Sequence, residues 1–104
     1  MTDVVMIFCT CGTHDEALTI GGSLVEARLA ACVNVLPRVH SIYRWEGKVE
    51  TAAEVLLIIK TTQERFPGVR DRITQLHTYD TPEIIVLPVI EGLDRYLAWL
   101  RDQV

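Results

Sequence analysis

Apolar residues are grouped along the chain into four strand-like runs and three helix-like stripes. The strand-like runs are rich in valine and isoleucine and lie at residues 3–11, 31–45, 48–62 and 82–90. The stripes repeat an apolar residue every three or four positions, as amphipathic helices do, and lie at residues 13–24, 64–77 and 93–104. The predicted element order is therefore β-α-β-β-α-β followed by a third helix.

This order predicts the overall architecture. Two β-α-β units joined by a hairpin form the split arrangement of the ferredoxin-like fold. Right-handed crossovers then give an antiparallel sheet with the strands in the order 4-1-3-2. Because 104 residues leave little room for two domains, we predict one α+β domain over residues 1–104, with a long hairpin and an extra C-terminal helix. The alternation shifts around Pro37, which indicates a β-bulge.

The predicted helices carry three features that a structure can test. Thr13 and Glu16 have the spacing of a capping box at the start of the first helix. Gly21-Gly22 costs this helix roughly 2 kcal/mol relative to two alanines, so we expect another backbone to approach closely there. The last helix is expected to bury one apolar face, made of Leu93, Tyr96, Leu97 and Leu100.

The predicted hairpin carries large apolar side chains at its tip, in the segment SIYRWEGKVE. Each of its strands runs for roughly 13 residues, or about 44 Å, whereas a compact domain of this length is roughly 33 Å across. The tip must therefore project, and monomers avoid exposed apolar edges of this kind. We expect Tyr43 and Trp45 to contact another subunit. The alternatives are that the tip folds back on its own helices or docks on a different protein.

Charge and hydropathy exclude several classes of partner. The net charge is −4, the pI is about 5.2 and no basic run is present, so nucleic acid is not an expected partner. The apolar runs are too short to span a bilayer. The start of the sequence has no basic region or cleavage pattern, and three cysteines make an odd number for a disulfide framework. We therefore expect a cytoplasmic protein with no membrane partner.

The predicted topology brings residues with metal-binding or catalytic chemistry to one edge of the sheet. These residues are Cys9, Cys11, His77, Tyr79, Asp80 and Glu83, whereas Cys32 should lie at the opposite end. Thiolate and imidazole donors suit copper or zinc, so Cys9 and His77 are candidate ligands. Core packing is the commoner role of buried cysteines, and a nucleophile–base pair, which we favour less than metal binding, is a further alternative. No nucleophile elbow, glycine-rich phosphate loop or H-E-x-x-H motif is present, so no catalytic residue is expected.

Several longer motifs resemble one known family, the CutA divalent-cation tolerance proteins. The matching segments are RLAACVNV (28–35), SIYRWEGKVE (41–50), EVLLIIKTT (54–62), LHTYDTPEIIVLPV (76–89) and YLAWL (96–100). They cover nearly the whole chain in order. The resemblance implies a fold similar to ferredoxin-like domains and to the PII signalling proteins.

The resemblance also implies a function. CutA proteins are homotrimers in which the long hairpin pairs with a neighbouring subunit, so Tyr43 and Trp45 are expected at the trimer interface. The implied role is a non-enzymatic response to metal ions: binding of copper or another divalent cation through Cys9 and His77, with no obligatory cofactor. The family's adjacent histidine and proline are replaced here by Leu76 and Thr78. The alternative is a PII-like regulatory trimer that binds a small anion or metabolite in its inter-subunit clefts.

Overall fold

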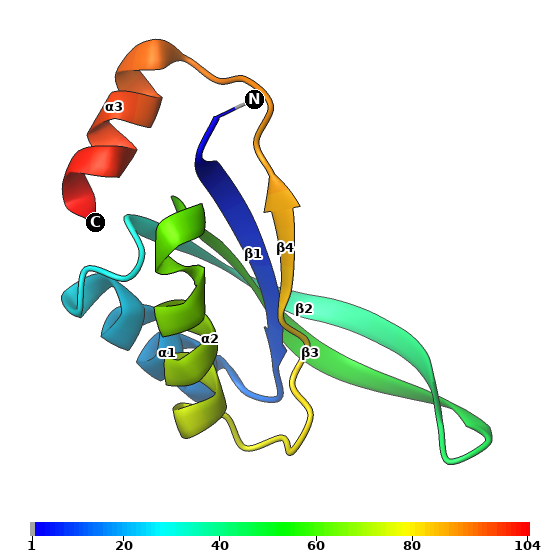
Figure 1. The fold of residues 1–104 in the computed structure, drawn as a ribbon. Helices are drawn as coiled ribbons and strands as arrows, with labels where there is room; N and C mark the ends of the chain where they lie inside the picture. The colour runs from blue at the N-terminus through cyan, green and yellow to red at the C-terminus, as the bar shows by residue number, and fades with distance from the viewer. Residues whose placement is uncertain (1) are drawn as a thin grey trace.

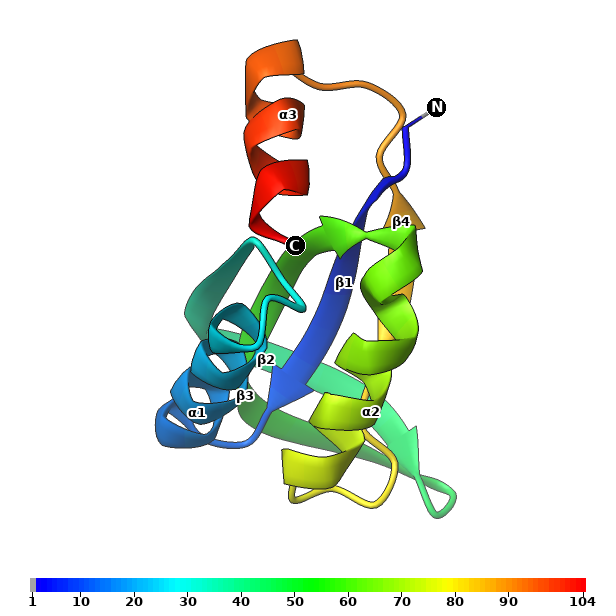
Figure 2. The ribbon, with the colours of Figure 1, turned by 60° about the vertical axis from the view of Figure 1, so that its left-hand side comes forward.

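The computed structural model describes residues 2–104 as a four-stranded sheet with helices on one face. The elements in chain order are β1 (Val4–Cys11), α1 (His14–Glu26), β2 (Cys32–Trp45), β3 (Lys48–Thr62), a 3-10 turn (Gln63–Arg65), α2 (Phe66–Leu76), β4 (Ile85–Pro88) and α3 (Asp94–Gln103). Helices α1 and α2 lie on the same face of the sheet, and α3 packs at one end of it (Figures 1 and 2).

The strands are ordered β2-β3-β1-β4, and every neighbouring pair is antiparallel. This confirms the predicted order 4-1-3-2 and the ferredoxin-like α+β fold. β1 pairs with β3 along its whole length but with β4 only from Val5 to Phe8. The fourth strand is therefore shorter than the predicted run 82–90. Proline at positions 82 and 88 lacks the N–H group that a longer ladder requires.

The main core lies between the sheet and the two helices. Alternate residues of a strand point to the same face, so Ile7, Cys9 and Cys11 all point from β1 toward the helices. The fully buried apolar partners of these residues include Leu57, Ile59, Ile20, Leu24, Val69 and Ile73. Both cysteines of β1 are thus part of the core.

Only one of the two hydrogen bonds of the predicted capping box forms at the start of α1. The Thr13 hydroxyl accepts a hydrogen bond from the Glu16 N–H at 3.1 Å. The Glu16 carboxylate does not return to Thr13: its oxygens accept from the Gly12 N–H at 3.2 Å and from the Thr78 N–H at 2.8 Å. The reciprocal half of the predicted capping box is therefore wrong, because the loop between α2 and β4 lies close enough to use this carboxylate.

The two glycines of α1 have different surroundings. A Cβ atom added to Gly21 would lie 3.1 Å from Val33 Cγ1 of β2, whereas one added to Gly22 would meet no atom within 4 Å. The close neighbour of the glycine pair is therefore a side chain, and the expectation of a second backbone was wrong.

Helix α3 buries a narrower face than the sequence predicts. Leu97 and Leu100 pack with Val4 in a second, smaller apolar cluster. Leu93 is 63 % exposed and Tyr96 is also exposed, because α3 covers only one end of the sheet. Within residues 2–104 no helix combines the length and the hydropathy needed to cross a membrane.

The β2–β3 hairpin projects from the rest of the molecule (Figure 1), and the described chain, hairpin included, has principal extents of 44 × 25 × 23 Å. The pairing register shifts between Leu36 and Val39, which confirms the predicted bulge. The tip is a two-residue turn with φ of 50° at Glu46 and 79° at Gly47, the left-handed conformation that such turns require. Ile42 is 73 % exposed, so the tip does not fold back on its own helices.

Candidate metal centre and adjoining pocket

Three soft or borderline donors converge where β1 ends. One ligand atom from each of Cys9, Cys11 and His77 lies within 4.8 Å of the other two, and all three residues are buried. The structure therefore brings together the two predicted ligand candidates, Cys9 and His77, and adds Cys11. Cys32 pairs with Lys60, which pairs with Met6 of β1, so Cys32 lies toward the opposite end of the sheet as expected.

The cysteines owe their positions to the alternation of β1. Cys9 pairs with Leu57 and Cys11 with Val55, and both thiols point into the helix-covered core with no exposed surface. The neighbouring Cys11 side chain and burial raise the pKa of the Cys9 thiol well above its usual value, and the carboxylates of Glu83 and Glu16 act in the same direction. Without a cation, Cys9 is therefore held as a neutral thiol.

His77 caps the C-terminus of α2, and both of its ring nitrogens are engaged. Its backbone N–H donates to Ile73 O, which places the ring against the end of β1. The Tyr79 N–H lies 3.0 Å from Nδ1, so Nδ1 is the acceptor. The proton then sits on Nε2, which donates to the Thr10 carbonyl at 2.8 Å. This pattern fits the neutral imidazole.

Glu16 fixes the loop that carries His77. Its carboxylate joins the Gly12 and Thr78 backbone amides, and its Oε2 atom lies 3.8 Å from His77 Nδ1. Burial alone would raise the pKa of Glu16, but the Thr78 and Gly12 N–H groups outweigh it and lower this pKa. The sequence pattern predicts Glu16 only as a helix cap, because a capping motif does not indicate a bond to the Thr78 N–H.

The donor set fits a small thiophilic cation. Zinc–sulfur bonds of about 2.3 Å and zinc–nitrogen bonds of about 2.1 Å place the ligand atoms of one tetrahedral ion roughly 3.5–3.8 Å apart. Separations of up to 4.8 Å therefore require the three side chains to move together by about 1 Å. The imidazole must also give up one of its two hydrogen bonds.

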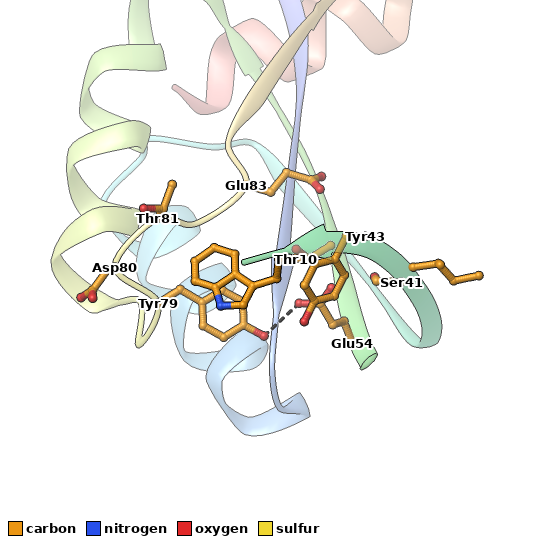
Figure 3. A pocket seen from close by; sticks show the side chains of 10 residues that line it. Thr10, Ser41, Tyr43, Glu54, Tyr79, Asp80, Thr81 and Glu83 are labelled. Atoms are coloured by element: carbon orange, nitrogen blue, oxygen red, sulfur yellow. Dashed lines mark hydrogen bonds between the residues drawn. The ribbon is translucent and has the colours of Figure 1, made fainter. Parts of the chain in front are cut away.

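The other predicted residues of this edge line an open pocket of about 620 Å³ rather than the donor cluster. Figure 3 shows the pocket between the hairpin and the loop after α2, with Tyr79, Asp80 and Glu83 on the loop side. The Tyr79 hydroxyl donates to Glu54 Oε2 at 2.9 Å, and burial together with this carboxylate raises the pKa of Tyr79 to about 12. Tyr43 lines the opposite wall.

Comparison with known proteins gives one consistent result. The profile of the CutA1 divalent ion tolerance protein family matches residues 5–103. The divalent-cation tolerance protein CutA of Thermus thermophilus is 49 % identical, over 98 % of this chain and 97 % of its own length. The chain spans about half the length of the plant and human relatives that it matches.

Solved structures agree with the sequence comparison. The Thermus thermophilus divalent cation tolerance protein superimposes with a TM-score of 0.94 at 46 % identity, over 96 % of this chain and 97 % of the other. CutA from Xylella fastidiosa superimposes with a TM-score of 0.95 at 43 % identity, over 98 % of both chains. The family profile, the sequence identity and the fold all agree, and the chain belongs to the CutA1 divalent ion tolerance protein family.

Proposed function

We propose that this protein is a non-enzymatic homotrimer that binds a divalent metal ion, with copper among the candidates, and contributes to divalent-cation tolerance. The observation that carries the proposal is the convergence of Cys9 and His77, joined by Cys11, in one buried cluster. The names of the family and of its bacterial relatives, which refer to divalent cations, support the same role.

The exposed apolar surface of the hairpin supports self-association. Ile42, Val49 and Trp45 are each more than half exposed, and the tip projects from the core. Both outer strands of the sheet, β2 and β4, have an unpaired edge within the described chain. Since exposed apolar strand edges are normally covered, a second copy of the hairpin or sheet is the natural partner. Three subunits are proposed from the resemblance to CutA.

Two observations argue against catalysis by Cys9. Its side chain has no exposed surface for a substrate to reach. The ring nitrogens of His77 bond to Thr10 and Tyr79, so the imidazole is not poised to take a proton from the thiol. The cytoplasm is the proposed location, because a reducing compartment keeps these cysteines as free thiols able to bind metal.

Calorimetric titration tests the metal proposal. The wild-type protein, reduced and stripped of metal, is titrated with divalent copper and with zinc in the absence of oxygen. We expect one ion per chain, lost or strongly weakened in Cys9→Ser and weakened in His77→Ala. Cys32→Ser is the matched control, since this thiol lies outside the cluster. Uptake that survives unchanged in Cys9→Ser, or no uptake by the wild type, contradicts the proposal.

The alternative, a regulator with a small ligand in its clefts, is supported by the 620 Å³ pocket. Among the described residues that line this pocket, Glu54, Asp80 and Glu83 are acidic and none is lysine or arginine. This lining repels anions and favours neutral or cationic compounds. A metabolite that raises the melting temperature of the wild type and of Cys9→Ser equally would favour this alternative over a metal-binding role.

A further inference from the structure

We propose that Cys11 is a metal ligand, and that the pair Cys9–Cys11 makes this a site for soft, thiolate-preferring ions. Such ions are cadmium, zinc and monovalent copper, as opposed to nickel or magnesium. The inference rests on the proposed metal-binding function and adds to it both a ligand and a class of ion.

The geometry of the two cysteines allows both sulfur atoms to bind one ion. Cys9 and Cys11 are two residues apart on β1, so their side chains leave the same face of the strand. The neighbouring pairs with β3, Cys9↔Leu57 and Cys11↔Val55, hold this stretch of backbone in a regular ladder. Both sulfur atoms thus lie within 4.8 Å of each other and of a His77 nitrogen.

The two thiols are freer to bind an ion than the ring nitrogens of His77 are. Each ring nitrogen of His77 is already in a hydrogen bond, of 2.8 Å to Thr10 O and 3.0 Å from the Tyr79 N–H. Apart from its interaction with the Cys11 thiol, the Cys9 thiol donates to the Thr10 carbonyl over a long distance of 3.8 Å. An ion that binds the two sulfur atoms therefore breaks no strong hydrogen bond, whereas one held by Cys9 and His77 alone does. The two thiols are therefore the main ligands, and the imidazole completes the ligand set.

The burial and the charge of the donor set also favour soft ions. Both thiols have no exposed surface, so an ion held there must shed its water. Magnesium dehydrates reluctantly and prefers oxygen ligands, whereas thiolates select softer ions. Two thiolates and a neutral imidazole carry a charge of −2, which a divalent ion neutralises. A neutral complex of ion and ligands costs the least free energy to bury. The site should therefore bind the divalent ions cadmium and zinc more tightly than monovalent copper.

Cadmium is the probe that tests this inference, because cadmium–thiolate bonds give an ultraviolet charge-transfer band. Reduced, metal-free wild type, Cys11→Ser and Cys32→Ser are titrated with cadmium chloride. We expect the wild type and Cys32→Ser to give the same band, and Cys11→Ser to give about half of it. The cadmium affinity of Cys11→Ser should fall by more than about tenfold, since even indirect changes at metal sites cost that much.

Other outcomes separately test the role of Cys11, the class of ion and the number of sulfur ligands. If Cys11→Ser gives the same band and the same cadmium affinity as the wild type, Cys11 is not a ligand. If cadmium binding is lost in Cys9→Ser in that case, the proposed metal-binding function still holds. Displacement of cadmium by an equal concentration of nickel overturns the ion class. Cadmium NMR of the wild type reports the number of sulfur ligands without any substitution: two support the inference, and one refutes it even if Cys11→Ser fails to fold.

Discussion

Glu16 connects three parts of the molecule through one carboxylate. It belongs to α1, it accepts from Gly12 in the turn after β1, and it accepts from Thr78 in the loop after α2. The loop that it fixes carries His77, whose ring in turn donates to the carbonyl of Thr10 in β1. The position of the candidate ligand is therefore set by main-chain hydrogen bonds on both sides of it.

Replacing Glu16 with alanine should destabilise the protein by about 3 kcal/mol, because a hydrogen bond to a charged group contributes about 1.5 kcal/mol or more and two are lost. Urea unfolding measures this difference, with Asp15→Ala as the control for removing an exposed acid from the same helical turn. An Asp15→Ala loss as large as that of Glu16→Ala would contradict this interpretation.

Since the folded pKa of Glu16 lies below 4.5, the contribution of Glu16 to stability is present above pH 4.5 and is lost as the pH falls through the folded pKa.

For single residues, the sequence predicts which side chains are candidate ligands better than it predicts the hydrogen bonds that hold them. The chemistry of Cys9 and His77 and their meeting at one sheet edge follow from residue types and topology. The bonds from Thr78 to Glu16 and from His77 to Thr10 join residues 62 and 67 positions apart, through main-chain groups that every sequence possesses. No residue pattern distinguishes those groups, so only the folded loop reveals them.

The elements themselves were largely predictable, because each has a strong periodic pattern. The bounds of β3 and the bulge at Pro37 agree with the prediction, and β2 begins one residue later than expected. The errors occur where tertiary contacts decide the outcome. α3 leaves Leu93 and Tyr96 exposed because it covers only one end of the sheet. The short β4 is a different case, since Pro82 and Pro88 are visible in the sequence.

The two glycines of α1 provide a test at the scale of one element. Gly22→Ala should stabilise the protein by about 1 kcal/mol, the difference in helix propensity, because nothing lies within 4 Å of the new methyl group. Gly21→Ala should gain less or lose stability, since its methyl group would crowd Val33 at 3.1 Å. Thermal unfolding of both variants checks the order. Equal gains would mean that Val33 moves aside freely.

The shape of the whole molecule is dominated by the hairpin. A core of two helices on a short sheet carries a strand pair that extends well beyond it, and the tip of that pair bears Tyr43 and Trp45. Trp45 is 59 % exposed, which is unusual for a residue of this size in a monomer. The same tip forms one wall of the acidic pocket, so a subunit bound at the tip would lie next to that pocket.

Native mass spectrometry determines whether the protein is a homotrimer with one thiophilic metal centre per subunit. Reduced wild-type protein is measured without metal and then with added zinc, cadmium or copper, beside Trp45→Ala at the same concentrations. We predict three chains for the wild type, up to three bound ions per assembly, and dissociation of Trp45→Ala at concentrations where the wild type remains intact, since buried aromatic residues commonly dominate interfaces. A wild-type monomer, or a trimer that takes up none of these ions, would contradict the account.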